Sequence, residues 1–361
     1  MHTAHGYAAR SSVGLLEPFT FLRRNLRPND LHIDILYCGV CHSDIHTARN
    51  EWDGTIYAGG TVYPCLPGHE IVGRVSELGT AATKFRVGDL VAVGTMVDSC
   101  GECTNCKTGH EPYCQQGATW TYNAADRISG ENTHSGYSDS IVVREEFVLK
   151  VTHDERDLAA VAPLLCAGIT MCSPLRHWKA GSGKKVGIVG IGGLGHMGIK
   201  LARALGAYVV AFTTSSNKRQ DAIALGADEV VASRNADEMV AHARTFDLIV
   251  NMVAVSHDLD PFVNLLKLDG TMAMVGIPAT PHPSPSIAGL LGLRRSIAGS
   301  LVGGINETQE FLDFCAEHNI LAQIETIPMQ QIATAFERMA RNEIKYRFVI
   351  DMKSLRAPQT V

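Results

Sequence analysis

The chain has 361 residues, 45% of them hydrophobic, and a mean hydropathy of +0.04, which is typical of a globular protein and favours two domains over one. The net charge of −5 and the pI of about 6.3 lack the basic excess of a nucleic-acid-binding protein, so we expect no nucleic-acid partner. The ten cysteines occur without an apolar N-terminal signal segment, so we expect a cytoplasmic protein whose thiols bind metal.

Residues 1–150 predict an all-β domain. Short strands lie between glycines and prolines in LHIDILYCGV, HEIVGRVSELG, GDLVAVG and YSDSIVVREEFVLKV. An apolar run then extends from Leu158 to Leu175, but Pro163, Gly168 and Pro174 interrupt it. We therefore interpret this run as buried helix rather than a membrane span, and we expect no membrane partner.

A cysteine-rich segment lies within this first half, at about residues 95–116. CGECTNCKTGHEPYC has the spacing C-x2-C-x2-C-x7-C and no apolar period, so it cannot pack as a hydrophobic core. Four soft ligands in a short loop are what a closed structural zinc site requires. A cluster of free or disulfide-bonded thiols is the alternative. The predicted ligands are Cys100, Cys103, Cys106 and Cys114.

From about residue 155 the pattern changes to strands that alternate with helices. KVGIV, YVVAF, DEVVA, FDLIVNMV and TMAMVGIP are apolar, and segments such as HMGIKLARALGA and KRQDAIALGA separate them. This alternation predicts a doubly wound parallel sheet. The tail from TQEFLDFCAEHNI to EIKYRFVIDM predicts one or two amphipathic helices and a final strand.

A glycine-rich turn follows the first of these strands. Gly190, Gly192 and Gly195 form G-x-G-x-x-G between KVGIV and the next helix. In this context the glycines permit a tight turn, a close approach to a pyrophosphate and helix–strand packing. The segment therefore predicts a dinucleotide site, with a turn that binds nothing as the alternative.

The residues after the second strand of this sheet bear on the choice of dinucleotide. An NAD site has an acid there, which bonds the ribose 2′-hydroxyl. Here YVVAF is followed by Thr213, Thr214 and Ser215, and then by Lys218 and Arg219. Hydroxyls and cations suit a 2′-phosphate, so we expect NADP(H). The alternative is a solvated basic helix start with a capping serine.

Five stretches together resemble one family. CGVCHSDIH, PGHEIVGRV, the cysteine segment, APLLCAGIT and GIGGLGHMGIK are similar to the zinc-dependent medium-chain alcohol dehydrogenases, and most closely to the cinnamyl-alcohol-dehydrogenase branch with its bacterial aldehyde reductases. The resemblance covers nearly the whole chain. It implies a GroES-like β-rich catalytic domain at 1–156 and 303–361, and a Rossmann cofactor domain at 157–302.

The resemblance also implies a catalytic zinc with Cys41, His69 and Cys166 as ligands. Spacing alone does not select these residues, because a cysteine on an apolar helix is more often a core thiol. The family's other catalytic roles fall on Asp44, which orients the ligand histidine, on Glu70 near the metal, and on Ser43 and His46 as a proton relay.

Further contacts follow from the same resemblance. Trp120 corresponds to an aromatic wall of the substrate pocket, although a packing role is equally open. SIAGSLVGG resembles the last sheet strand, which in the family pairs with its copy and implies a homodimer. Besides the threonines, serine and lysine above, the implied cofactor contacts are His42, Thr170, Gly190, Gly192, Gly193, Leu194, Gly195, Val275, Gly276 and Ser300.

The expected function is reversible hydride transfer between NADP(H) and primary alcohols or aldehydes, with one catalytic and one structural Zn2+ per chain. Substrates would be small, aromatic or aliphatic, and of broad range. An NAD-preferring zinc alcohol dehydrogenase is the nearest alternative. A zinc-dependent non-catalytic binding protein and a zinc-free reductase or regulatory protein are more distant ones.

Overall fold

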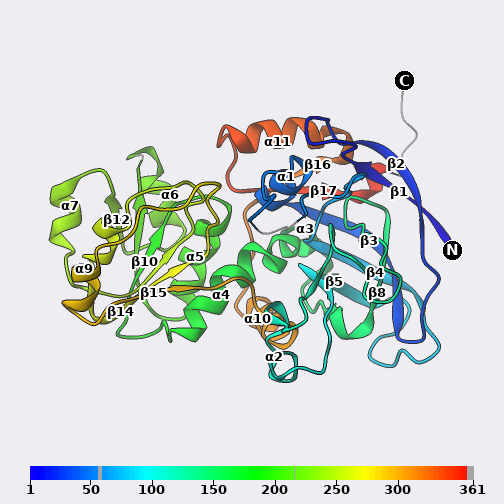
Figure 1. The fold of residues 1–361 in the computed structure, drawn as a ribbon, viewed down its shortest axis with the longest axis horizontal. Coiled ribbons are helices and arrows are strands. Elements are labelled where there is room, and N and C mark those ends of the chain that lie inside the picture. The colour runs from blue at the N-terminus through cyan, green and yellow to red at the C-terminus, as the bar shows by residue number, and fades with distance from the viewer. Residues whose placement is uncertain (56–58, 215, 356–361) are drawn as a thin grey trace. The chain divides into compact units, whose positions relative to one another are not determined.

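The computed structural model describes residues 1–55, 59–214 and 216–355. The chain divides into two compact units, Met1–Cys166 with Gly304–Val361, and Ala167–Gly303 (Figure 1). Ser215, one of the expected cofactor contacts, lies outside the described residues.

The first unit is built on a mainly antiparallel sheet. Its strand order is β16-β17-β3-β4-β5-β9, β8 also pairs with β3, and the β16–β17 pair is parallel. The central strand β3 buries Leu31, Ile33 and Ile35 in the core, which explains its apolar sequence. The strands are β1 (His2–Ala8), β2 (Glu17–Arg23), β3 (Asp30–Val40), β4 (Ile71–Leu78), β5 (Leu90–Val93), β6 (Met96–Asp98), β7 (Thr119–Trp120), β8 (Ser140–Arg144), β9 (Leu149–Lys150), β16 (Ile324–Pro328) and β17 (Arg347–Asp351).

Helical segments of this unit include one that the strand pattern missed. The helix α1 (His42–Ala48) interrupts the expected all-β region directly after β3, and the Asp44 carboxylate accepts the N–H of Cys41 at its start, at 2.9 Å. Seven residues are too few to show a helical period. The others are α2 (Thr104–Lys107), η1 (Glu111–Tyr113), η2 (Glu145–Phe147), η3 (Glu155–Asp157), α3 (Leu158–Val161), η4 (Ala162–Leu165), α10 (Ile305–Glu317), η6 (Met329–Gln331), α11 (Ile332–Ala340) and η7 (Met352–Leu355).

The first boundary between the units lies at Cys166, whereas the sequence interpretation ended the first domain at residue 156. Residues 157–166 belong with the first unit because α3 and η4 contact β3, β4 and β17. The apolar run from Leu158 to Leu175 is largely buried helix. Among the described residues no single helix is long and apolar enough to span a membrane. The segments Glu155–Leu165 and Ala167–His177 reach the required length and hydropathy only when they are counted together, and the chain bends between them.

The second unit contains the predicted parallel sheet. All its strand pairs are parallel, in the order β12-β11-β10-β13-β14-β15, which is the doubly wound order. Helices flank the sheet (Figure 1). The elements are α4 (Ala167–His177), β10 (Lys185–Val189), α5 (Gly193–Ala204), β11 (Tyr208–Thr213), η5 (Ser216–Lys218), α6 (Arg219–Ala224), β12 (Glu229–Ala232), α7 (Ala236–Ala241), β13 (Phe246–Asn251), α8 (Asp260–Val263), β14 (Leu266–Met274), α9 (Ile287–Leu291) and β15 (Ser296–Gly299).

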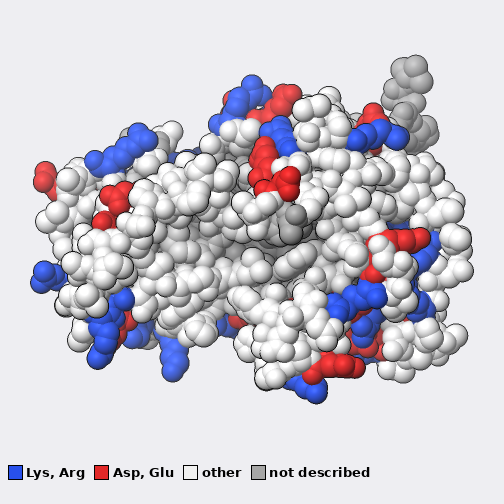
Figure 2. Space-filling view, in the orientation of Figure 1, with Lys and Arg blue, Asp and Glu red and all other residues white. Residues whose placement is uncertain are grey.

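Charged side chains of both signs are interspersed on the face drawn in Figure 2, over each unit. This distribution agrees with the small net charge of −5.

Candidate metal centres and cofactor loop

Four buried side chains from distant segments meet in the first unit. Cys41 precedes α1, His69 and Glu70 precede β4, and Cys166 follows η4; one ligand atom from each lies within 4.8 Å of all the others. The two Sγ atoms are 3.9 Å apart. Two thiolates on a tetrahedral zinc, each with a Zn–S bond of about 2.3 Å, lie about 3.8 Å apart. The donor set therefore fits zinc.

The thiol chemistry of this site also suits a metal. The hydrogen bond between the two thiols lowers the pKa of Cys41 well below its usual value, and the same bond raises that of Cys166. The two buried sulfurs thus share one hydrogen bond, in which either can be the donor. A divalent cation bound between them would replace thiol protons and neutralise thiolates, which is how zinc sites bind cysteine.

His69 is oriented by the buried Asp44 carboxylate. Its Nδ1 lies 3.0 Å from Oδ1 of Asp44, which leaves Nε2 as the ligand atom. Oδ1 also accepts the N–H of Gly68 at 3.1 Å, and Oδ2 accepts the N–H of Cys41 and the hydroxyl of Tyr137, both at 2.9 Å. Tyr137 is fully buried, and sequence reasoning missed it because a tyrosine before an ordinary strand carries no motif.

Glu70 is held by a buried arginine. Arg347, at the start of β17, forms an ion pair with Oε1 of Glu70. Burial raises the pKa of Glu70 to about 7, although the arginine charge opposes this. Among the described residues Oε2 of Glu70 has no hydrogen-bond partner. This oxygen is therefore an available acceptor beside the two sulfurs, which agrees with a carboxylate that approaches the metal.

The predicted relay residues share one face of α1. Ser43 and His46 are three residues apart, and Oγ of Ser43 lies 3.6 Å from the Cys41 sulfur. Nδ1 of His46 lies 2.5 Å from Oε2 of Glu51, and its ring lies 5.2 Å from that of Trp52. Glu51 was not predicted. A carboxylate that fixes one ring nitrogen leaves the other available for proton transfer.

The four predicted lobe cysteines also meet. The Sγ atoms of Cys100, Cys103, Cys106 and Cys114 all lie within 4.8 Å of one another, and two pairs are 3.5 and 3.8 Å apart. These cysteines are free thiols, and such separations exclude the disulfide alternative, since S–S bonds are about 2.05 Å. Backbone N–H donors, chiefly that of Cys106, lower the pKa of Cys103 to about 6. The cluster therefore fits a closed zinc site.

The glycine loop after β10 has the geometry of a phosphate cradle. A Cβ on Gly195 would lie 2.0 Å from the carbonyl oxygen of Gly190, so only glycine allows the helix to approach the strand here. Gly192 faces open space, since a Cβ there would meet no atom within 4 Å. Gly193 and Leu194 form the first turn of α5. Backbone N–H groups at such a helix start bind phosphate.

Lys218 lies across this loop, whereas Arg219 is occupied elsewhere. Nζ of Lys218 donates to the carbonyl oxygen of Ile191 at 3.0 Å, inside the glycine loop. Arg219 forms an ion pair with Glu238 at 3.2 Å. Thr213 ends β11 and is buried, while Thr214 is exposed. Of the two cations, Lys218 is therefore the one that contacts the glycine loop.

The other expected cofactor contacts lie in both units. Val275 and Gly276 follow β14 and donate their N–H groups to the carbonyl of Asn251, and Ser300 follows β15. All three lie at the carboxyl end of the parallel sheet, where dinucleotides bind. Thr170 is buried in α4, and His42 is an exposed first residue of α1.

Two aromatic residues bear on the expected pocket. Trp120 ends β7 and packs, half-buried, against the core of the first unit, a position that leaves both of its possible roles open. Tyr122 is buried, and its ring lies 5.6 Å from that of His69. Tyr122 is therefore an aromatic side chain in ring contact with a predicted metal ligand, and sequence reasoning missed it.

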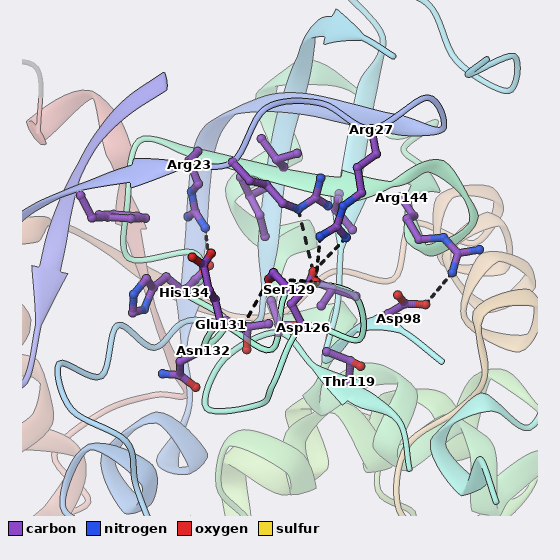
Figure 3. Close-up of a pocket in the computed structure, with 18 of the residues that line it drawn as sticks. Arg23, Arg27, Asp98, Thr119, Asp126, Ser129, Glu131, Asn132, His134 and Arg144 are labelled. Carbon is purple, nitrogen blue, oxygen red and sulfur yellow. Dashed lines mark hydrogen bonds and ion pairs between the residues drawn. The ribbon is translucent and has the colours of Figure 1, made fainter. Parts of the chain in front are cut away.

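A separate cavity of about 380 Å³ opens in the first unit beside β2, β6 and β8 (Figure 3). Two ion pairs lie on its wall, Arg27 with Asp126 at 2.8 Å and Arg144 with Asp98 at 2.6 Å. The described residues that line it include none of the predicted site residues. This cavity is not part of the candidate site.

Comparison with known proteins gives matches over nearly the whole chain. A family model described as "Alcohol dehydrogenase GroES-like domain" matches residues 27–153, and one described as "Zinc-binding dehydrogenase" matches residues 193–317. An aldehyde reductase, YahK, of Escherichia coli is 61% identical over 94% of this chain and 95% of its own length.

Two further similar proteins agree with this match. An NADP-dependent alcohol dehydrogenase C of Mycolicibacterium smegmatis is 49% identical over 99% of this chain and 100% of its own length. The solved structure of a cinnamyl alcohol dehydrogenase from Sorghum bicolor superposes with a TM-score of 0.92 at 42% identity, covering 98% of each chain.

Proposed function

Because the chain belongs to the family of zinc-binding alcohol dehydrogenases with a GroES-like domain, we propose that it catalyses the reversible, NADP(H)-dependent interconversion of aldehydes and primary alcohols. The resemblance to the cinnamyl-alcohol-dehydrogenase branch and its bacterial aldehyde reductases is confirmed. So is the expected combination of a GroES-like domain with a doubly wound cofactor domain.

One observation carries the assignment of the chemistry. Cys41, His69 and Cys166 come from three distant segments, yet their ligand atoms meet beside a histidine-orienting carboxylate. Zinc held there supplies a Lewis acid for the carbonyl oxygen of an aldehyde or the hydroxyl of an alcohol. Cys41, His69 and Cys166 would hold the zinc as three protein ligands, as in catalytic zinc sites, whereas the lobe offers four sulfurs, as in structural ones.

The chain's own groups complete the reaction. Ser43 lies beside the Cys41 sulfur and donates a proton to, or accepts one from, the substrate oxygen. His46 exchanges that proton with solvent, since its side chain is 27% exposed. Glu51 holds Nδ1 of His46 and so fixes which ring nitrogen takes part. NADP(H) supplies or accepts the hydride.

Replacement of His46 tests the relay. We expect His46→Ala to fold, to keep zinc and to lose about 10²-fold or less in kcat near neutral pH, the effect of one acid–base group. The loss should shrink at high pH in alcohol oxidation, where hydroxide takes the proton. A pH–rate profile equal to that of the wild type would remove His46 from the mechanism. Glu51→Gln keeps the size and shape of the side chain but removes its charge, and it should shift the pH–rate profile less than His46→Ala does.

Two observations support NADP(H) as the cofactor. The strand β11 ends without a carboxylate, and Lys218 lies across the glycine loop. A lysine pairs with a 2′-phosphate, whereas an acid at this place would repel it. The relative of M. smegmatis carries NADP dependence in its name. Zinc at two sites and NADP(H) thus form the proposed cofactor set.

Lys218 should carry a measurable part of this preference. A charge-assisted hydrogen bond contributes about 1.5–3 kcal/mol, so Lys218→Ala should weaken NADPH binding about ten- to a hundredfold and leave NADH nearly unchanged. Arg219→Ala is the matched control, because Glu238 already pairs with Arg219 and the variant should bind NADPH nearly as the wild type does. Equal losses with both cofactors would contradict the phosphate contact.

Steady-state kinetics with both cofactors test the function itself. Aromatic, aliphatic and terpenoid aldehydes should be reduced with NADPH at a higher kcat/KM than with NADH, and metal analysis should give two zinc ions per chain. Efficient use of NADH would favour the NAD-preferring alternative. Absence of turnover in a protein loaded with zinc would overturn the proposal.

The homodimer and the cytoplasmic location are further parts of the proposal. At the edge of the parallel sheet, β15 leaves one side for a partner strand, and Ile287 and Leu291 of α9 are exposed by 65% and 77%. A two-fold copy that adds its own β15 would cover this apolar surface. Light scattering should give twice the chain mass of 38.9 kDa; a monomer at micromolar concentration would contradict this.

A further inference from the structure

The amino end of the parallel sheet carries a chain of polar side chains that the proposed function does not use. Lys185 begins β10, and its Nζ lies 3.0 Å from Nδ1 of His242, which follows α7. Nε2 of His242 lies 3.3 Å from Oε2 of Glu229, the first residue of β12. In this order an imidazole takes the proton of a nucleophile while a carboxylate holds the imidazole.

Lys185 differs from two neighbouring lysines in its partners. Lys184 and Lys267 both pair with Asp247, at 3.1 and 2.5 Å. In the part of the chain that the structure describes, Nζ of Lys185 forms no such ion pair and lies over the rings of Phe246 and Tyr208, at 4.9 and 5.6 Å. These rings attract an ammonium group, yet burial lowers the pKa of Lys185.

We propose that Lys185 is a site of covalent modification by aldehydes, at which its amine forms an imine. His242 accepts the proton of the ammonium, and the neutral nitrogen attacks the carbonyl carbon. The N–C bond forms as the π pair of the carbonyl moves to oxygen, which takes that proton from His242 and becomes a hydroxyl. The carbinolamine nitrogen then gives a second proton to His242, which passes it to the hydroxyl, and water leaves as the nitrogen lone pair forms the C=N bond. One ammonium and one aldehyde give one protonated imine and one water, with no change of oxidation state.

This site is distinct from the cofactor loop. Lys185 stands at the amino end of β10 and Gly190 follows its carboxyl end, five residues away along an extended strand. At about 3.3 Å per residue, the two positions are roughly 16 Å apart. The inference rests on the proposed function only in naming aldehydes as the electrophiles that the protein meets. Formation of the imine needs neither zinc turnover nor NADP(H).

Reductive trapping tests the inference. Purified zinc-loaded protein is incubated with propanal and cyanoborohydride in the absence of NADP(H), and alkylated peptides are quantified by mass spectrometry over time. We expect Lys185 to be alkylated several-fold faster than Lys184 and Lys267, which serve as internal controls. His242→Ala and the isosteric Glu229→Gln should reduce the rate at Lys185 toward that of the controls and leave the control lysines unchanged.

The outcomes separate this inference from the proposed function. Equal labelling of the three lysines, or an unchanged rate at Lys185 in both folded variants, would overturn the modification site. Selective labelling in a protein that shows no aldehyde reduction with NADPH would leave the site standing and overturn the enzyme assignment instead.

Discussion

Cys41→Ser should abolish turnover while the protein stays folded. Cys41 contributes one of two sulfurs that lie 3.9 Å apart beside His69, and serine is a poor replacement for a thiolate ligand. Loss of a Lewis acid worth several kcal/mol corresponds to a decrease in kcat of about 10³-fold or more. Steady-state assays with NADPH and an aldehyde measure this, and metal analysis should show one zinc per chain in place of two.

A nearby thiol provides the matched control. Cys38 is fully buried in β3 but belongs to neither cluster, so Cys38→Ser should keep both zinc ions and most of the activity. Near-normal turnover of Cys41→Ser would show that the metal assignment is wrong. Loss of activity could also arise because Cys41→Ser fails to fold. Circular dichroism and the zinc content of the soluble protein distinguish an unfolded variant from a folded variant that has lost only its catalytic zinc.

Cys103→Ser should act on stability instead. The segment Cys100–Cys114 contains only the short α2 and η1 and little buried apolar surface, so its order depends on the metal. We expect roughly 3–5 kcal/mol of lost unfolding free energy, or loss of soluble protein, as for other losses of a structural metal. Urea denaturation measures the change. Lys107→Ala, in the same lobe, should leave stability within about 0.5 kcal/mol.

Any folded Cys103→Ser should retain its catalytic zinc and a kcat near that of the wild type. Cys41→Ser should thus lose activity and keep its stability, whereas Cys103→Ser should lose stability and keep its activity. If Cys103→Ser lost activity without losing stability, the lobe would not be the structural site.

Strong local patterns made much of the fold predictable. The alternation of apolar strands and helices after residue 155 gives the observed parallel order, because the central strands β10, β11 and β13 are buried on both faces. The helix α1 was missed because HSDIHTA has no apolar period and is fixed by the Asp44 carboxylate at its first turn. The boundary near Cys166 depends on contacts of α3 and η4, which no local pattern reports.

The candidate site also contains residues that a local pattern predicts and residues that it does not. The four lobe cysteines and the three glycines are local in sequence, so their chemistry can be read from spacing. Cys41, His69 and Cys166 are far apart along the chain, and only the family resemblance brought them together before the structure did. Tyr122 and Tyr137 contact His69 and Asp44 from distant parts of the chain, so no local pattern predicts them. Glu51 lies only five residues from His46, but the two residues form no recognised motif.

The surroundings of Asp44 have a consequence for metal exchange. Its two oxygens accept four hydrogen bonds, from His69, Gly68, Cys41 and Tyr137, and all four donors belong to the protein. A chelator that strips the catalytic zinc therefore leaves the His69 ring clamped in its ligating orientation. We therefore expect reconstitution with zinc to require little reorganisation of His69, and the rate of metal uptake to depend on access to the site rather than on refolding.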